Sequence, residues 1–140
     1  LILVSTCSPD TNTPNTASIL QDKLGARQVG AFDINNACTG FVSATDIADS
    51  YIKSGKAKTV LVVSAETLSR IVDYTDRSTC ILFGDGAAAA VYQATEDETV
   101  GILSTFTAQT VRAQSTCTWK PCRSRIRFPV TARWTRRRVS

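Results

Sequence analysis

Three short apolar runs along the first half of the chain predict three strands. Residues 1–6 fit a buried parallel strand, although a run this short is equally compatible with a piece of helix. Residues 29–34 form a second run, which is interrupted by a glycine. Residues 59–64 form the third and are the richest in β-branched side chains, which favour strands.

A first helix is predicted between the first two runs. Thr13 is a suitable N-cap, Pro14 suits the first helical position, and Gly25 suits the left-handed residue that ends a helix. The inner face of this helix is predicted to carry Ala17, Leu20 and Leu24, which recur at helical spacing.

A second helix is predicted between the second and third runs, ending at Gly55. Its apolar stripe is predicted to be Phe41, Thr45, Ala48 and Ile52. Gly40 in its first turn costs about 1 kcal/mol relative to alanine. A ligand that approaches the backbone and tight packing of the helix would each explain this glycine.

Strands and helices therefore alternate in βαβ order, and the sequence predicts the α/β class with right-handed crossovers. Farther along, the Phe-Gly-Asp-Gly-Ala run at 83–87 lacks the third glycine of a dinucleotide fingerprint. We interpret it as a tight turn between residues 80–83 and a strand of small residues at 87–92.

Composition limits where the chain works and what it binds. The 140 residues suit one domain and are 43% apolar, with no run long enough to span a bilayer and no export leader. The odd set of five cysteines has neither metal-ligand nor secreted-disulfide spacing, so a reducing cytoplasm is expected. The cysteines are Cys7, Cys38, Cys80, Cys117 and Cys122. Histidine is absent.

Charge divides the chain into two differently composed segments. Up to Glu98, twelve acidic residues outnumber seven basic ones and give a net charge of −5. From Val111 onward there are nine basic residues and no acidic one. The first residue already lies in an apolar run, without a preceding Met or polar lead, which suggests a fragment.

Cys38 is the strongest candidate for chemistry. It lies where the second strand is expected to end and the second helix to begin. Free backbone N–H groups and the helix dipole at such a junction stabilise a thiolate, which predicts a lowered pKa for the thiol. The same N–H groups could hold a developing oxyanion. For a cysteine considered alone, however, a role as a small apolar filler is the commoner explanation.

Several motifs together support a chemical role for Cys38. They are Asn-Asn-Ala-Cys-Thr-Gly-Phe at 35–41, Ile-Lys-Ser-Gly at 52–55, Leu-Val-Val-Ser-Ala-Glu-Thr-Leu-Ser-Arg at 61–70, Tyr-Thr-Asp-Arg at 74–77 and Phe-Gly-Asp-Gly-Ala at 83–87. In this order they resemble β-ketoacyl-acyl-carrier-protein synthase III, a condensing enzyme with a thiolase-like fold. The match covers residues 1 to about 104, less than half of that family's length.

The resemblance implies a fold and a domain division. Residues 1–104 are expected to be a partial thiolase-like domain with a mixed sheet, incomplete at both ends. Residues 105–140 are expected to be a basic, non-matching tail, frameshifted or disordered.

The resemblance also implies a reaction. In that family a cysteine thiolate takes an acyl group from acyl-coenzyme A and passes it to malonyl-acyl-carrier protein, starting type II fatty-acid synthesis. Cys38 inherits the nucleophile's role, with no cofactor or metal, in a cytoplasmic homodimer. A His and an Asn from the family's second half assist condensation. This chain has no His, and Asn35 and Asn36 belong to the turn before Cys38, so we expect it not to complete the reaction.

Three binding residues follow from the same resemblance. Arg77 is expected to contact the adenine end of coenzyme A, and Leu68 and Phe83 to form the wall of the acyl pocket. The alternatives are ordinary ones. Residues 65–79 are expected to be irregular, and their charged side chains would then lie in a solvated loop with weak ion pairs. Leu68 and Phe83 would then be core residues.

The tail from about residue 106 has no periodic apolar pattern. Its arginines with Trp119 and Trp134 would suit a nucleic-acid-binding arm, whose salt-dependent binding would be lost on cutting after Ser104. We favour a frameshifted or misassembled coding sequence, because codons for residues 116–121 read one base upstream can encode Leu-Tyr-Met-Glu-Ala; DNA sequencing tests this. A polyketide-type synthase of the thiolase superfamily is a further alternative, and nothing before the tail favours nucleic acid.

Overall fold

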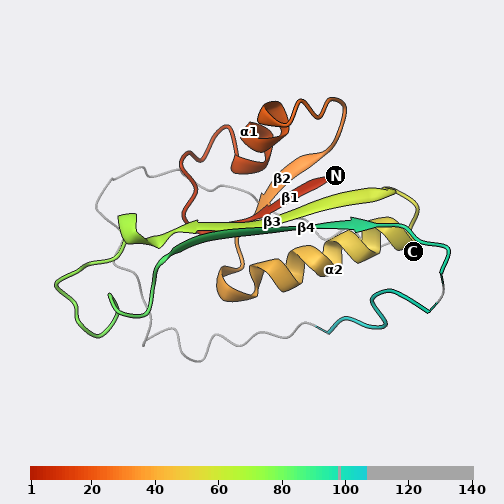
Figure 1. The fold of residues 1–140 in the computed structure, drawn as a ribbon. Coiled ribbons are helices and arrows are strands. Elements are labelled where there is room, and N and C mark those ends of the chain that lie inside the picture. Colours follow the sequence, from red (N-terminus) through yellow and green to blue (C-terminus); the bar gives the residue numbers. More distant parts are fainter. Residues whose placement is uncertain (98, 107–140) are drawn as a thin grey trace, which may run out of the picture. The chain divides into compact units, whose positions relative to one another are not determined.

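A computed structural model describes residues 1–97 and 99–106, and these form a sheet with one helix on each face (Figure 1). The strands are β1 (Ile2–Ser5), β2 (Ala31–Ile34), β3 (Thr59–Thr67) and β4 (Asp85–Gln93). The α-helices are α1 (Thr16–Lys23) and α2 (Gly40–Lys53), and two short 3-10 helices are η1 (Ala37–Thr39) and η2 (Leu68–Arg70). None of the helices in this part of the chain is long and apolar enough to cross a membrane.

The strand order in the described sheet is β2-β1-β3-β4. β1 is parallel to both of its neighbours, so that Ile2 pairs with Ala31 on one side and Leu61 on the other. β4 runs antiparallel to β3 along its whole length. The α/β class and the mixed sheet predicted from the sequence are confirmed.

The two faces of the sheet bury separate cores, because successive side chains of a strand point to opposite faces. On one face Ile2 and Val4 pack with Ala17 of α1. On the other face Leu3, Val60 and Val62 pack with Ala44 and Ala48 of α2. Figure 1 shows α1 above the sheet and α2 below it.

The start of α1 differs from the prediction. The N-cap is Asn15 rather than Thr13, and its side chain accepts a hydrogen bond from the Ser18 N–H at 2.8 Å. The Asp33 carboxylate of β2 accepts two more, from the N–H groups of Thr16 at 2.8 Å and Ala17 at 2.7 Å. The helix begins where its free N–H groups find these acceptors, and Pro14 lies outside it, after a cis peptide bond.

The end of α1 is partly as predicted. Gly25 has a positive φ of 63°, as expected of the residue that ends this helix. Ala17 is fully buried and Leu20 packs against the same core. Leu24 was predicted to face inward, but it is the C-cap and its exposed fraction is 56%.

Gly40 opens α2 against the end of β1. A Cβ at this position would collide with the Ser5 Oγ and lie 3.1 Å from the Ser5 Cβ. Tight packing of helix on strand therefore accounts for the glycine. Ala48 of the predicted stripe is buried, and Phe41 and Ile52 pack around it.

β3 and β4 are longer than the sequence predicted. β3 continues beyond Ser64 to Thr67, so the first part of the expected irregular stretch is strand. These extra residues pair with the beginning of β4, where Glu66 lies opposite Gly86. β4 begins at Asp85, two residues before the predicted start at residue 87. β2 begins at Ala31, two residues after the predicted start at residue 29. Residues 107–140, which hold most of the predicted tail, lie outside the described residues.

Candidate active site

The carboxyl ends of β1, β2 and β3 lie at one edge of the sheet because the three strands are parallel. Cys7 follows β1, Cys38 follows β2 and Leu68 follows β3. Open α/β sheets bind their ligands outside this edge. The candidate site is therefore built from three segments that are far apart in the sequence.

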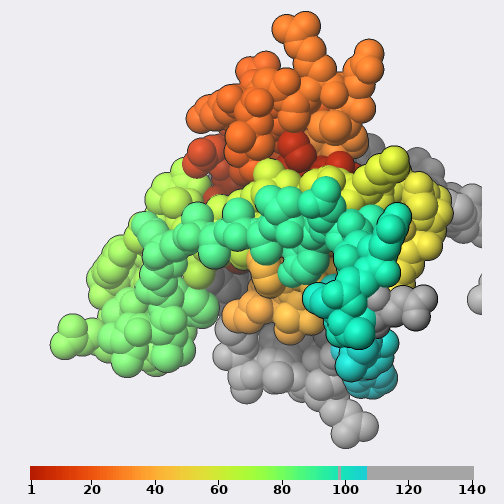
Figure 2. Space-filling view, turned by 45° about the vertical axis from the view of Figure 1, so that its right-hand side comes forward, coloured from red at the N-terminus to blue at the C-terminus, as the bar shows by residue number. Residues whose placement is uncertain are grey.

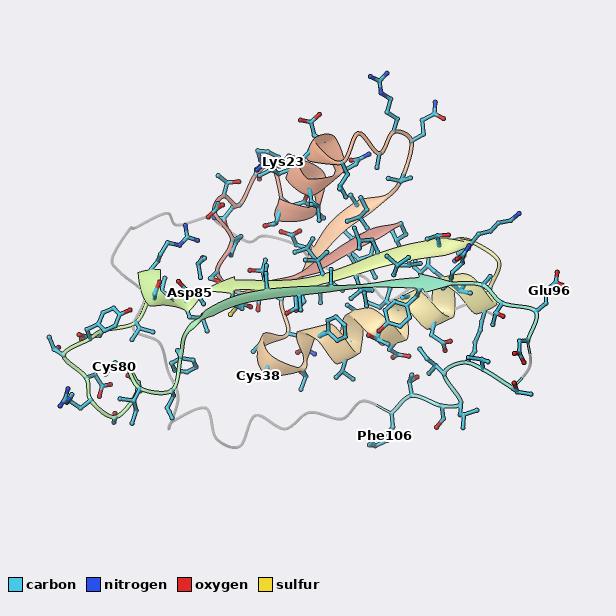
Figure 3. All side chains as sticks on the ribbon, in the orientation of Figure 1. Lys23, Cys38, Cys80, Asp85, Glu96 and Phe106 are labelled. Carbon is cyan, nitrogen blue, oxygen red and sulfur yellow. The ribbon has the colours of Figure 1, made fainter. Side chains whose placement is uncertain are left out.

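Cys38 is the middle residue of η1, the turn that joins β2 to α2, and it is exposed. Figure 3 labels it beside the first turn of α2. The turn is held by a hydrogen bond from the Thr39 hydroxyl to the Asn36 carbonyl at 2.9 Å and by one from the Asn36 side chain to the Ser43 hydroxyl at 2.8 Å. Ala37 has a φ of 45°, a conformation that costs energy for a residue with a Cβ.

The Cys38 backbone N–H donates to no acceptor among residues 1–97 and 99–106. The N–H groups of the next two residues are used, because Thr39 donates to the Asn36 carbonyl at 3.2 Å and Gly40 donates to the Ala37 carbonyl. A free N–H on a cysteine can donate to an oxygen that becomes negative when that cysteine's sulfur attacks a carbonyl.

Glu66 is the centre of a polar cluster at the same edge. Its carboxylate accepts hydrogen bonds from the Cys7 N–H at 2.9 Å and from the Ser8 hydroxyl. The hydroxyl oxygen of Ser8 in turn accepts a hydrogen bond from the Thr67 N–H at 2.8 Å. This side chain lies on β3 and is partly buried, so the solvated loop considered from the sequence is wrong for Glu66.

Arg70, the last residue of η2, binds two residues of the segment that follows β1. Its guanidinium donates to the Ser8 carbonyl at 2.9 Å and forms an ion pair with Asp10 at 2.8 Å. Both partners of the ion pair are exposed, so its contribution to stability is small. Its structural effect is to hold the segment after β1 against the end of β3.

Cys7 is half-buried beside this cluster, and its environment raises the pKa of its thiol. Burial is the main cause, because it disfavours the charged thiolate. A hydrogen bond to Glu66 and the negative charge of that carboxylate add to the effect. The charge of Cys38 adds a smaller effect in the same direction.

The three predicted binding residues occupy different places. Leu68 opens η2 directly after β3 and is half-buried at the same edge as Cys38. Phe83 is half-buried shortly before β4. Arg77 is exposed on the long loop between η2 and β4, the loop marked by Cys80 in Figure 3. Its side chain forms no hydrogen bond or ion pair within the described part of the chain.

Cys7 and Glu66 were not identified as site residues from the sequence. The signal was present, because Cys7 follows the first apolar run and Glu66 follows the third by two residues. Using it requires knowing that these two runs pair in parallel, which places their carboxyl ends side by side. Among the described residues, no group of His, Cys, Asp or Glu could hold a metal ion.

The model of the family described as 3-oxoacyl-[acyl-carrier-protein] synthase III matches residues 32–110 of the chain, which is more than half of it. The chain belongs to this family. The motif around Cys38 and the motifs at 61–70, 74–77 and 83–87 all lie in the matched part.

Named relatives agree with the family. A β-ketoacyl-[acyl-carrier-protein] synthase III of Xanthomonas campestris is 61% identical over 105 residues, covering 75% of this chain and 32% of that protein. The crystal structure of a 3-oxoacyl-[acyl-carrier-protein] synthase III from Aquifex aeolicus has a TM-score of 0.67 at 57% identity, over 69% of this chain and 31% of its own. The chain thus spans about a third of the length of these relatives.

A synthase from another pathway is similar as well. The priming β-ketosynthase of the R1128 polyketide pathway has a TM-score of 0.65 at 40% identity, over 67% of this chain and 28% of its own. The partial thiolase-like fold expected from the sequence is confirmed by these structures.

Proposed function

We propose that Cys38 is the acyl-accepting nucleophile of a condensing acyltransferase that starts type II fatty-acid synthesis. The overall reaction converts acyl-coenzyme A and malonyl-acyl-carrier protein to 3-oxoacyl-acyl-carrier protein, CO2 and coenzyme A. The observation that carries the proposal is an exposed cysteine in the turn before α2, at the carboxyl edge of the sheet, within the part of the chain that matches the family.

The first half of this reaction is acyl transfer to Cys38. The sulfur attacks the thioester carbonyl, the tetrahedral oxyanion collapses, and coenzyme A leaves as its thiol. The free N–H of Cys38 supports this step, because it can donate to the oxyanion. Coenzyme A takes part as a substrate, and the mechanism uses no cofactor.

The second half is decarboxylation of malonyl-acyl-carrier protein and attack of the resulting carbanion on the acyl group. In the family this half uses a His and an Asn. The sequence has no His, so we assign only the acyl transfer to the residues of this chain. The proposal includes a cytoplasmic homodimer as the working form.

The binding roles belong to the same proposal. Leu68 would form part of the wall around the acyl group, which its half-buried place at the same edge of the sheet as Cys38 supports. Phe83 would form another part of that wall. Arg77 would contact the adenine end of coenzyme A, and its exposed side chain, free of protein partners among the described residues, supports that role.

A second candidate is the priming step of polyketide synthesis. The similarity to the R1128 priming synthase favours it. Both candidates give Cys38 the same role and differ in the carrier protein that receives the acyl group. A condensation assay with the carrier proteins of the two pathways, using the protein that contains this chain, separates them.

The test of the proposal is the intact mass of the chain after incubation with acetyl-coenzyme A. We expect the mass of one added acetyl group, removed by hydroxylamine as a thioester. The Cys38→Ala variant should gain nothing, whereas the Cys80→Ala variant should gain the acetyl group like the parent. Acetylation that persists in Cys38→Ala, or none on protein with the circular dichroism of an α/β fold, would overturn the assignment.

A further inference from the structure

Two thiols occupy the edge where the acyl group would be bound, and only one of them takes part in the proposed function. Cys38 is exposed in the turn before α2, and Cys7 is half-buried after β1. Each is a free thiol. The Cys7 thiol has no role in the proposed acyl transfer, although it lies at the same edge of the sheet as Cys38.

The backbone brings the two residues together from both sides of the turn. Before the turn, β2 is paired with β1 as far as Ile34 opposite Ser5, and the ladder continues with a bond from the Thr6 N–H to the Ile34 carbonyl at 3.0 Å. After the turn, Gly40 packs directly on Ser5. In the chain Cys38 lies between these two contacts, both of which are made with the end of β1, the strand that Cys7 follows.

Ala37, in the turn between the two contacts, has a positive φ of 45°. Electrostatic interaction between the thiols agrees with this geometry, because the charge of Cys38 acts on Cys7. Cys7 and Cys38 thus lie in the segments that directly follow two paired strands.

We propose that Cys7 and Cys38 form a reversible disulfide when the protein meets a peroxide. Cys38 is the residue oxidised first, because it is exposed. Cys7 is the resolving thiol, because it is half-buried at the end of β1 and held there by its N–H bond to Glu66. The disulfide does not depend on the proposed function, whereas its effect on acyl transfer does.

The chemistry balances with hydrogen peroxide as the oxidant. The Cys38 thiolate attacks the O–O bond, forming a sulfenic acid and releasing hydroxide. The Cys7 sulfur then attacks the Cys38 sulfur, forming the S–S bond and expelling a second hydroxide. The two thiol protons convert both hydroxides to water, so two thiols and one peroxide give one disulfide and two waters. The Glu66 carboxylate, which accepts the Cys7 N–H at 2.9 Å, lies beside this thiol as a base for its proton.

The consequence is a redox switch at the nucleophile. A Cys38 sulfur bound to Cys7 cannot attack a thioester, and a reducing agent restores it. The bond also protects Cys38 from the irreversible sulfinic and sulfonic acids that an isolated reactive cysteine reaches.

The test uses the whole chain treated with hydrogen peroxide in native buffer, blocked with N-ethylmaleimide and digested with trypsin without reduction. We expect a peptide pair in which residues 1–23, carrying Cys7, are linked to residues 28–53, carrying Cys38, with the loss of two hydrogens. Dithiothreitol should separate the pair.

Two variants and one solvent serve as controls. Cys80→Ser should form the same linked pair, and Cys7→Ser should leave a Cys38 sulfenic acid that dimedone captures. The same oxidation in urea should pair cysteines without preference, so the linked pair should be several-fold enriched in native buffer. Equal yields in the two solvents, or sulfinic acid on Cys38 while Cys7 stays reduced, would overturn the proposal.

Acetylation separates this proposal from the proposed function. The oxidised chain should take no acetyl group from acetyl-coenzyme A and should regain this ability after dithiothreitol. If the reduced chain takes none either, the proposed function fails while the linked peptides still decide the disulfide. Acetylation of a chain that carries the Cys7–Cys38 bond would overturn the switch.

Discussion

At the scale of single residues, two cysteines at one edge of a sheet are placed in different environments. Cys38 lies on an exposed turn whose backbone N–H is free. Cys7 lies against a carboxylate that accepts its own N–H. Because reactivity of a thiol depends on exposure and on thiolate content, the first suits a nucleophile and the second suits a thiol that stays protonated.

The role of Glu66 in this difference can be measured. Replacing Glu66→Gln removes a negative charge beside Cys7, so the raised pKa of the Cys7 thiol should fall while burial keeps part of the effect. The pH at which iodoacetamide modifies Cys7 at half its maximal rate should therefore decrease. Asp85→Asn, which removes a carboxylate bonded to Ser69 instead, should not change it. An unchanged midpoint in Glu66→Gln would contradict the contact.

The same pKa shift makes stability depend on pH. A raised pKa means that the folded state holds the Cys7 proton more tightly than the unfolded chain does. The stabilisation is fully present below the pKa of an unfolded thiol and is lost as the pH rises through the higher, folded-state pKa. Compared with Cys7→Ser, the parent chain should lose more free energy of unfolding in urea titrations across the alkaline range. Parallel losses in the two proteins would contradict this.

At the scale of elements, the strand β1 and the helix α2 meet at a contact that only glycine allows. Figure 2 shows part of the helix, in golden orange, below the green strand. The Cβ of any other residue at position 40 would enter the space of the Ser5 side chain. This contact also sets the position of the turn that carries Cys38, because the turn ends where Gly40 begins the helix.

Substitution at position 40 tests this packing, because the sign of the change in the free energy of unfolding depends on it. In an open helix, alanine in place of glycine stabilises by about 1 kcal/mol. Here Gly40→Ala should instead destabilise by about 1–3 kcal/mol through overpacking, measured by urea unfolding. The double variant Ser5→Gly with Gly40→Ala should recover part of the loss.

Gly84→Ala is the matched control, because a Cβ at Gly84 meets nothing within 4 Å. Its free energy of unfolding should stay within about 0.5 kcal/mol of the parent, as for other surface changes. A stabilising Gly40→Ala would show that the helix does not lie this close to Ser5.

The elements that sequence analysis placed correctly are those set by local pattern. The β-branched run of β3, the stripe of α2 and the terminating Gly25 all follow from neighbouring residues. The start of α1 was misplaced because Asp33, distant in sequence, caps it. The end of β3 was missed because its polar residues are strand only through pairing with β4.

At the scale of the whole described unit, one sheet separates two small cores. Leu3 is fully buried under α2, while Ile2 and Val4 face α1. Cys38 and Leu68 could be named from local motifs, but Cys7 and Glu66 could not, because parallel pairing of β1 with β3 is what brings them to this edge of the sheet. Stability of this sheet is therefore a condition for the site.

Truncation of the core tests that condition. Leu3→Ala should lower the free energy of unfolding by about 2–5 kcal/mol, because it leaves a cavity beneath α2. Leu103→Ala is the control, since Leu103 is 96% exposed and its loss should change stability by less than about 0.5 kcal/mol. Equal effects of the two substitutions on urea unfolding would contradict the placement of this core.

Acyl transfer to Cys38 can be located to a single peptide. The most direct test is a peptide map of the chain after incubation with acetyl-coenzyme A and blocking of free thiols at low pH. We expect residues 28–53, which contain Cys38, to carry the acetyl group. Residues 1–23 and 78–112, which contain Cys7 and Cys80, should carry only the blocking group. An acetyl group on either of those peptides, with Cys38 blocked, would contradict acyl transfer to Cys38.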